Sequence, residues 1–175
     1  QRDDLVKAEN VLLEIIDEMD TIMNEKFITT FKEINEEFRL VFRQLFNGGD
    51  ASLKLSDENN ILETGIEINA SPAGKNLKSI SLLSGGEKTL TAISLLFAIL
   101  RVKPVPFCIL DEVEAALDEV NVDNFGKYLS LFRNKTQFIV ITHKKKTMEY
   151  ADCLYGITMQ ESGVSKIVSV NLESI

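Results

Sequence analysis

Residues 107–112 read FCILDE, a run of four apolar residues that ends in two carboxylates. This short continuous apolar run, preceded by Pro106, predicts a parallel strand that is covered on both faces. Such a strand would deliver Asp111 and Glu112 to the carboxyl edge of the sheet, where ligands of open α/β sheets bind. Phosphoryl transfer needs a carboxylate near Mg²⁺, which suits Asp111, and a group that orients or deprotonates the attacking water, which suits Glu112. The alternative is a pair of exposed acids at a helix start, where the helix dipole favours them.

A second segment, LSGGEK at residues 83–88, opens a helix that is predicted to run from Gly86 to about Val102. Gly85 and Gly86 would let a phosphate approach the backbone closely, and the free N–H groups of the first turn would point toward it. The hydroxyl of Ser84 adds another donor. The same Ser-Gly-Gly-Glu letters would also serve as an ordinary helix N-cap. The segment alone does not choose between these interpretations.

Two more polar residues follow predicted elements of the same sheet. His143, the single histidine, comes directly after the predicted strand Gln137–Thr142, so it points to the same edge as the carboxylates. Asp118 precedes a helix that is predicted to extend to about Phe132. A lone histidine is more often an ordinary residue, and Asp118 is also a natural helix N-cap. Both alternatives stay open on the residues alone.

One part of a nucleotide site is absent from the sequence. The pattern Gly-x-x-x-x-Gly-Lys-[Ser/Thr] does not occur, and its nearest imitation, AGKN at residues 73–76, lacks the first glycine and the hydroxyl residue. Without that loop, nothing in the chain is predicted to cradle the α- and β-phosphates. The sequence therefore predicts half of a nucleotide site.

The first 46 residues contain no Pro or Gly and predict one long helix. Its early apolar residues alternate spacings of three and four, the heptad pattern of a coiled coil: Leu5, Ala8, Leu12, Ile15, Met19 and Ile22. A wider, aromatic-rich stripe that suits packing on a globular body follows: Phe27, Phe31, Ile34, Phe38, Val41, Phe42 and Leu45. We therefore expect a protruding coiled-coil arm over residues 1–26 and a globular lobe over residues 27–175.

The rest of the chain predicts an α/β lobe. Gly48 and Gly49 are expected to end the first helix, and a short helix is expected near Thr147–Ala151. Further strands are predicted at Ala51–Leu55, Ile61–Ile68, Cys153–Met159 and Val164–Val170. Alternation of strands and helices around residues 107–151 indicates a mixed α/β sheet.

The composition and net charge argue against two functions, non-specific DNA binding and membrane association. The net charge of −8 opposes non-specific adhesion to DNA phosphates, and the one basic run, Lys144–Lys146, is more typical of a solvated face than of a binding patch. No run of 18 apolar residues occurs, so no membrane partner is expected. Cys108 and Cys153 are expected to pack as small apolar residues. Because the chain begins with Gln1 and carries no signal-peptide pattern, we expect an internal or trimmed fragment of a cytoplasmic protein.

Four motifs in this order resemble the signature, Walker B, D-loop and His-switch of ABC-type ATPases: Leu83–Lys88, Phe107–Glu112, Ala116–Asp118 and Thr142-His143. The fuller stretches PVPFCILDEVEAALDE at 104–119 and MQESGV at 159–164 closely resemble bacterial-type Smc, the structural-maintenance-of-chromosomes ATPase family. The leading heptads resemble the returning coiled-coil arm of that family. The resemblance implies an ABC-ATPase-like, carboxyl-terminal head lobe with a stub of the arm.

The resemblance also implies roles for the motif residues. Two heads of this family sandwich two ATP molecules, so Leu83, Ser84, Gly85, Gly86 and Glu87 would form the signature that meets the γ-phosphate of ATP bound on the opposing head. Asp111 would hold Mg²⁺ through water, and Glu112 would be the catalytic base. His143 and the D-loop residue Asp118 would position phosphate and water.

The implied partners are an amino-terminal head lobe that carries Walker A, a second Smc head in a homodimer, a ScpA-like kleisin subunit, and DNA through the full complex. The implied setting is nucleoid-associated and cytoplasmic, in chromosome condensation, segregation and sister chromatid cohesion. The isolated chain is expected to be inactive because Walker A is absent.

Three other interpretations compete. A transporter nucleotide-binding domain shares the motifs, but such domains lack a heptad arm and usually carry Gln where Glu87 stands. A coiled-coil DNA-repair ATPase shares both the arm and the split head. A third possibility is a non-enzymatic module that binds kleisin.

Overall fold

The computed structural model describes residues 2–57, 60–61, 63–74, 78–132 and 135–172. The chain divides into two compact units. Unit 1 comprises residues 1–83 and 94–103, and unit 2 comprises residues 84–93 and 104–175. Helix α2, Gly85–Val102, contributes to both units.

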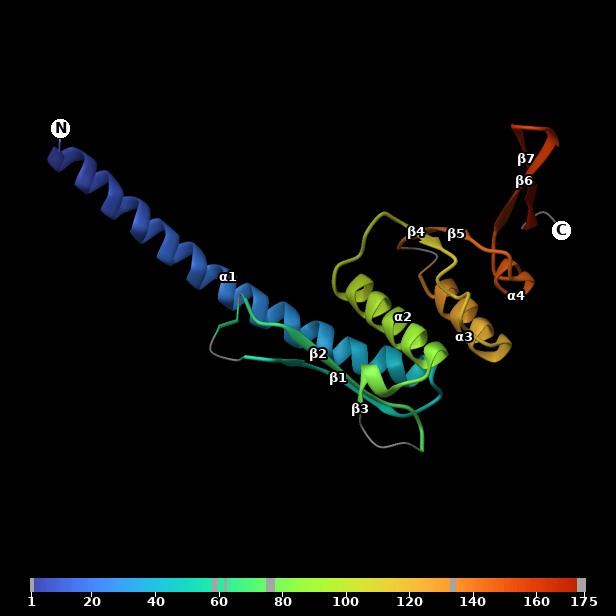
Figure 1. Ribbon diagram of the computed structural model, residues 1–175, viewed down its shortest axis with the longest axis horizontal. Helices are drawn as coiled ribbons and strands as arrows, with labels where there is room; N and C mark the ends of the chain where they lie inside the picture. The colour runs from blue at the N-terminus through green and yellow to red at the C-terminus, as the bar shows by residue number, and fades with distance from the viewer. Residues whose placement is uncertain (1, 58–59, 62, 75–77, 133–134, 173–175) are drawn as a thin grey trace. The chain divides into compact units, whose positions relative to one another are not determined.

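Unit 1 combines a long helix with a small sheet (Figure 1). Helix α1 spans Arg2–Leu45, which confirms the predicted first helix. Strands β1 (Asp50–Leu55), β2 (Ile66–Ser71) and β3 (Lys78–Ser79) form an antiparallel sheet in that order, and the 3-10 helix η1 covers Ile80–Leu82. The side chain of Asn35 on α1 accepts a hydrogen bond from the Leu53 backbone N–H at 2.6 Å, which ties the helix to β1.

The core of unit 1 uses the aromatic stripe that the sequence predicts. Phe38, Val41, Phe42 and Leu45 on α1 are buried, together with Ala51, Leu53, Ala70, Phe97, Ala98 and Leu100. Because these α1 residues recur three and four positions apart, one face of the helix reaches the core while the other stays in solvent.

The turn after α1 depends on glycine. Gly48 and Gly49 have φ angles of 131° and 82°, which L side chains rarely adopt. A Cβ on Gly49 would also lie 2.3 Å from the carbonyl oxygen of Ser71. Arg43 holds this turn by donating to the Gly49 carbonyl at 3.2 Å and by pairing with Asp50 at 3.0 Å. The predicted end of the first helix is thus confirmed.

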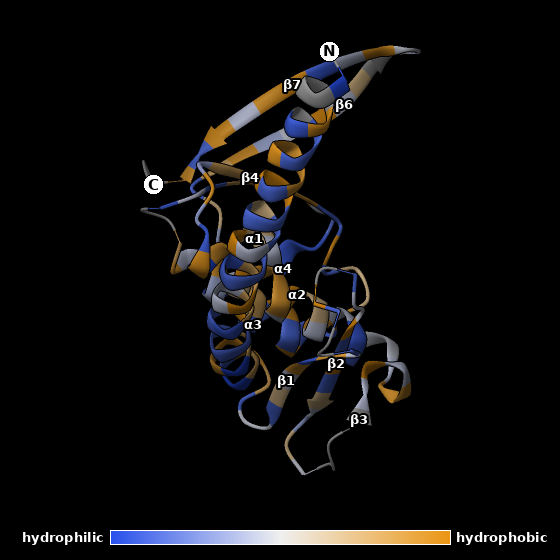
Figure 2. Cartoon of the chain, turned by 90° about the vertical axis from the view of Figure 1, so that its left-hand side faces the viewer, coloured by the Kyte–Doolittle hydropathy of each residue, from blue (hydrophilic) through white to orange (hydrophobic). Residues whose placement is uncertain are grey.

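The early heptad positions of α1 are apolar and exposed. Leu12, Ile15, Met19 and Ile22 all present large apolar side chains to solvent, and Figure 2 shows apolar and polar residues interspersed along this helix. The side chains of Leu5 and Ala8 lie outside the described residues. A coiled-coil partner for this seam stays a prediction, as does the boundary at residue 26.

Unit 2 contains a parallel strand pair and an antiparallel hairpin (Figure 1). Its elements are β4 (Phe107–Asp111), α3 (Glu119–Ser130), β5 (Gln137–Ile141), α4 (Lys145–Met148), β6 (Cys153–Glu161) and β7 (Val164–Asn171). Strands β4 and β5 are parallel, with Phe107 opposite Gln137 and Asp111 opposite Ile141. The predicted α/β class is confirmed, and its parallel and antiparallel pairings are divided among three sheets.

The predicted strand Ile61–Ile68 is wrong at its start. Ile61 lies in a turn, and β2 begins only at Ile66. The Ser56 N–H donates to the Gly65 carbonyl at 2.9 Å, and the Asp57 N–H donates to the Thr64 hydroxyl at 2.7 Å. These bonds close a loop between the end of β1 and the start of β2. Ile61 lies within that loop, so it does not pair with β1.

The prediction that β4 is covered on both faces is also wrong for this chain. Leu110 is buried, but Phe107 and Ile109 are 57% and 58% exposed. Ile139 and Ile141 on β5 are 48% and 51% exposed on the same face, because paired residues of parallel strands share a face. Within the described residues, unit 2 therefore covers only one face of this strand pair.

Most described residues of the β6–β7 hairpin are exposed, including the apolar residues Tyr155, Ile157 and Ile167; Figure 2 shows apolar residues on both strands. Among the helices that the structure describes, none is both long and apolar enough to cross a lipid bilayer.

Candidate functional site at the carboxyl edge of β4 and β5

Asp111 is the last residue of β4, and Glu112 extends the strand pairing by one bond, from its N–H to the Ile141 carbonyl at 2.9 Å. Glu112 has a φ angle of 46°, in the left-handed region that non-glycine residues seldom occupy. This conformation turns the chain sharply out of the strand. Backbone conformations of this kind persist where surrounding bonds hold them, and they concentrate at functional sites.

The structure brings His143 to Glu112. Strand β5 ends at Ile141, and His143 follows two residues later, so its side chain lies at the same sheet edge as the carboxylates. Its Nδ1 lies 3.3 Å from Glu112 Oε1, and both side chains are exposed. The predicted meeting of Asp111, Glu112 and His143 at one edge is therefore observed.

Asp118 caps helix α3. Its carboxylate accepts a hydrogen bond from the Asn121 N–H at 2.8 Å, so the N-cap interpretation is correct. The turn that leads to it is braced by the Leu117 N–H, which donates to the Glu114 carbonyl at 3.0 Å, and by Lys144, whose Nζ donates to the Leu117 carbonyl at 2.5 Å. A cap does not exclude a second role, because Asp118 remains exposed.

The signature-like segment forms a capping box at the start of α2. Glu87 Oε2 accepts bonds from the Ser84 N–H at 3.0 Å and from the Ser84 hydroxyl at 2.9 Å, while the Glu87 N–H points back to Ser84 Oγ at 3.4 Å. Leu83 is buried, and its N–H donates to the Ile80 carbonyl. The N-cap interpretation is thus also correct here.

The two glycines of this segment have different surroundings. A Cβ on Gly86 would lie 3.2 Å from the Ala116 carbonyl oxygen, so the first turn of α2 packs closely on the turn before Asp118. A Cβ on Gly85 would meet no atom within 4 Å. The backbone at Gly85 is therefore open to a ligand, while Gly86 joins the signature-like segment to the D-loop-like turn within unit 2.

Sequence reasoning missed Glu114. This side chain is only 1% exposed, and its Oε1 accepts hydrogen bonds from the hydroxyls of Thr142 and Thr147. Its other oxygen, Oε2, is buried with no hydrogen-bond partner among the described residues. A carboxylate among Val113, Ala115 and Ala116 was the available signal, since an acid in an apolar stretch suggests a buried group with specific partners.

The donor set fits part of a Mg²⁺ and ATP site. In the ranges that the structure describes, no group of three or more His, Cys, Asp or Glu side chains could hold a metal. Asp111 offers one carboxylate, and Mg²⁺ is commonly held by one or two carboxylates with phosphates and water supplying the rest. The open backbone at Gly85 suits a phosphate, but Lys75 and Asn76 of the AGKN imitation lie outside the described residues.

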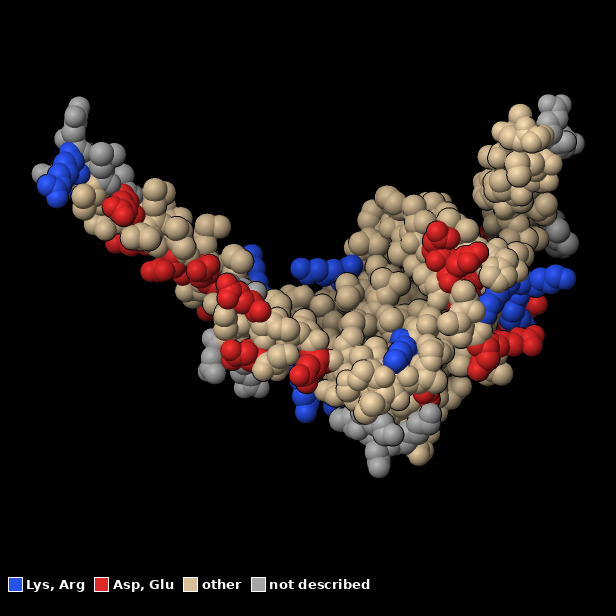
Figure 3. Space-filling model, viewed as in Figure 1, with Lys and Arg blue, Asp and Glu red and all other residues tan. Residues whose placement is uncertain are grey.

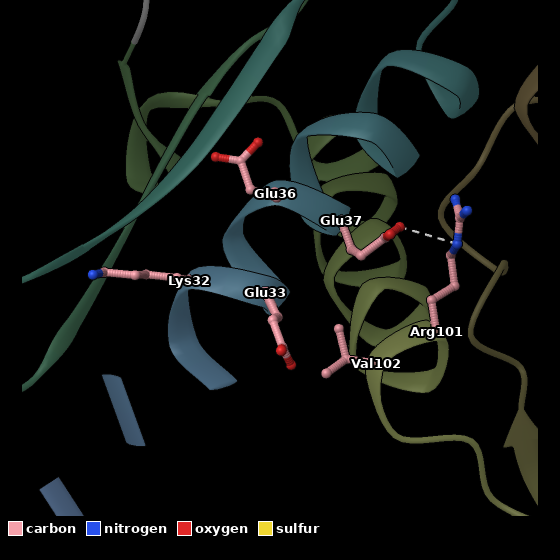
Figure 4. A pocket seen from close by; sticks show the side chains of 6 residues that line it. All are labelled: Lys32, Glu33, Glu36, Glu37, Arg101 and Val102. Carbon is pink, nitrogen blue, oxygen red and sulfur yellow. Dashed lines mark ion pairs between the residues drawn. The ribbon is translucent and has the colours of Figure 1, made fainter. Parts of the chain in front are cut away.

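A pocket of about 460 Å³ lies elsewhere, in unit 1, between α1 and the end of α2 (Figure 4). It is lined by Lys32, Glu33, Glu36, Glu37, Arg101 and Val102. Arg101 Nε pairs with Glu37 Oε2 at 3.0 Å, so part of its charge is neutralised internally. None of the site residues predicted from sequence lines it.

The basic run Lys144–Lys146 is largely used within unit 2. Lys144 binds the Leu117 carbonyl, and Lys146 pairs with Asp123 at 3.4 Å and with Glu149 at 2.7 Å. Figure 3 shows basic side chains beside acidic ones at this end of unit 2. Lys145 is exposed, so the run forms the predicted solvated face only in part.

Residues 9–166 match the family described as the RecF/RecN/SMC N terminal domain. The chain belongs to the RecF/RecN/SMC family. It is 60% identical over 173 residues to the chromosome partition protein Smc of Bacillus subtilis (strain 168), an alignment that covers 99% of this chain and 15% of that protein. The chain thus spans about 15% of the length of the Smc relatives that it matches.

Solved structures agree with this family assignment. A Smc head domain with an extended coiled coil, bound to the C-terminal domain of ScpA from Pyrococcus furiosus, superimposes with a TM-score of 0.84 at 40% identity, over 94% of this chain and 41% of that one. A second solved structure gives a TM-score of 0.76 at 42% identity. It comes from work on the structural biochemistry of ATP-driven dimerization and DNA stimulated activation of SMC ATPases. That match covers 86% of this chain and 91% of the other.

Proposed function

We propose that this chain is the carboxyl-terminal lobe of a Smc ATPase head. It would supply the hydrolytic residues of a composite ATP site and the signature segment that meets ATP bound on the opposing head. The observation that carries the proposal is the contact between Glu112 and His143 at 3.3 Å, beside Asp111, in a chain without a phosphate-binding loop. ATP hydrolysis would serve chromosome partition in the full protein, as the names of the relatives suggest.

Each of the two carboxylates at the end of β4 would have its own role. Asp111 would hold Mg²⁺ through water, and the bound ion would supply charge stabilisation at the phosphates. Glu112 would orient and deprotonate the attacking water, and its exposed carboxylate near the imidazole of His143 supports this role.

The signature segment Leu83–Glu87 would meet the γ-phosphate of ATP on an opposing head. Support comes from the helix dipole at the start of α2 and from the open backbone at Gly85. Asp118, held at the start of α3 and connected to Gly86 through the packed turn at Ala116, would position water or phosphate across the same interface.

The exposed face of β4 and β5 supports the existence of a further lobe. Parallel strands are normally covered on both faces, yet Phe107, Ile109, Ile139 and Ile141 all lie exposed in this chain. An amino-terminal head lobe that carries the phosphate-binding loop would bury these side chains and place that loop near Asp111, which shares their face.

The expected partners follow from the relatives. Structures of Smc heads bound to ScpA domains support a ScpA-like kleisin as a partner, and the ATP-driven dimerization described for related SMC ATPases supports a second head. DNA would be engaged through the full complex in the nucleoid, because the net charge of −8 does not favour DNA binding by this lobe alone.

The test is a complementation assay. The purified chain should show negligible ATP hydrolysis, and adding the amino-terminal lobe should restore turnover. Robust hydrolysis by the chain alone would refute the proposed division of the site. Binding of a ScpA-like kleisin without any restored hydrolysis would instead favour the non-enzymatic interpretation.

A further inference from the structure

Glu114 lies between two segments that the proposed reaction needs. It sits in the turn that runs from Glu112 to Asp118, and its side chain points to the segment that carries His143. At 1% exposure it is the one charged side chain that is buried among the described residues. A buried carboxylate is costly to desolvate unless hydrogen bonds compensate, so its partners indicate its role.

Those partners bracket His143. Thr142 directly precedes His143 and donates its hydroxyl to Glu114 Oε1, while Thr147, on α4, donates to the same oxygen at 3.0 Å. The Thr142 hydroxyl also accepts the Lys144 N–H at 3.0 Å. One carboxylate oxygen therefore fastens the segment 142–147 on both sides of the histidine.

A hydrogen bond from Lys144 is the third link between the two segments. Lys144 Nζ donates to the Leu117 carbonyl, so the residue after His143 is also bound to the turn. Between these fastened neighbours, His143 is left exposed, with its Nδ1 near Glu112. The position of the imidazole relative to Glu112 is thus set by residues on either side of it, not by contacts of its own that bury it.

We propose that Glu114 is a positioning residue, which through the Thr142 hydroxyl holds His143 in register with Glu112. This inference rests on the proposed function, because it assigns the support for a histidine that acts in hydrolysis. The physical effect is preorganisation: a fastened imidazole keeps its geometry between turnovers, and small misplacements of catalytic groups lower rates strongly.

The decisive variant is Thr142→Val in the full-length protein, because valine keeps the shape of threonine and removes only the hydroxyl. The kcat for ATP hydrolysis should fall roughly 10- to 100-fold while KM changes little, as expected when geometry is lost and binding is kept. Thr147→Val is the matched control: it removes the other hydroxyl from the same oxygen but leaves the link to His143, so kcat should fall much less.

Glu114 itself is tested by two substitutions. Glu114→Gln keeps an acceptor oxygen for both hydroxyls, whereas Glu114→Ala leaves both hydroxyls without the oxygen that accepts their hydrogen bonds. Gln should therefore retain clearly more of kcat than Ala. If Glu114→Ala does not fold, the Thr142→Val comparison still decides the matter.

Coupling to the histidine separates this inference from the proposed function. His143→Ala should lower kcat, and adding Thr142→Val should lower it no further, since both act through the same group. If the kcat of the double variant instead falls by the product of the two single-variant factors, Glu114 does not position His143. The role of His143 in hydrolysis would then still stand. An unchanged kcat in His143→Ala would overturn the role of His143 and, with it, this inference.

Discussion

At the scale of single residues, Glu112 combines a left-handed backbone with an exposed carboxylate at the strand end. Substituting Glu112→Gln keeps the side-chain shape and removes the proposed base. In a complete head, hydrolysis should fall about 10²- to 10⁴-fold, the usual contribution of a general base, while ATP binding and engaged dimers persist. Steady-state turnover and cross-linking of engaged heads measure the two effects.

The control for Glu112→Gln is Glu119→Gln, which removes another exposed carboxylate, from the first turn of α3. This variant should hydrolyse ATP normally. If Glu112→Gln also hydrolyses normally, Glu112 is not the base, although the observed contact with His143 would stand.

Ser84 carries two roles that a pair of variants can separate. Its hydroxyl belongs to the capping box of α2, so Ser84→Ala should destabilise the fold by about 1 kcal/mol. Ser84→Arg loses the same cap and adds bulk and charge at the proposed head-to-head surface. ATP-dependent engagement should therefore fail in the arginine variant, whereas the alanine variant, which loses only one donor to the phosphate, should retain more of it, as measured by cross-linking. Engagement of the arginine variant at the level of the unaltered protein would contradict the signature assignment.

At the scale of elements, α3 contacts the turn that follows α4 at Gly126. A Cβ at this position would lie 2.1 Å from Tyr150 Cδ2, because the tyrosine ring rests on the helix backbone there. Alanine normally favours a helix over glycine by about 1 kcal/mol. Here the sign should reverse, with Gly126→Ala lowering the free energy of unfolding by roughly 1–3 kcal/mol through overpacking.

Chemical denaturation measures this effect, and Tyr150→Ala supplies the control background. With the ring removed, Gly126→Ala should no longer destabilise unit 2. A destabilisation of the same size in both backgrounds would show that the tyrosine contact is not the cause.

The same helix pair carries a charge network that makes stability depend on pH. Hydrogen bonds from Lys127 and Tyr150 lower the pKa of Asp123 from 3.8 to about 2. A lowered carboxyl pKa stabilises the fold above about pH 4, and that contribution is lost as the pH falls toward about 2. The thermal advantage of the unaltered chain over Asp123→Asn should therefore shrink across this interval. A constant difference would contradict the network.

Some features follow from short sequence patterns and others need the folded chain. Asp111, Glu112 and His143 were predictable together because parallel strands end at one edge. Glu114 was not, because its two hydroxyl partners are 28 and 33 residues away and meet it only after β5 and α4 pack. Likewise, the apolar residues of β4 predict a strand that prefers burial, but they do not identify the part of a protein that covers it.

At the scale of the whole molecule, the exposed face of β4 and β5 predicts that this chain needs a covering lobe. Ile109→Asp places a carboxylate in the middle of that face, opposite Ile139, where burial would leave it unpaired. The variant should remain folded, since Ile109 is exposed in this chain, yet fail to associate with the amino-terminal lobe in co-purification. Val120→Asp, at an apolar position on α3 that is 68% exposed, should associate normally. If Ile109→Asp also associates, the lobe contacts another surface, and the exposed strand face requires a different partner.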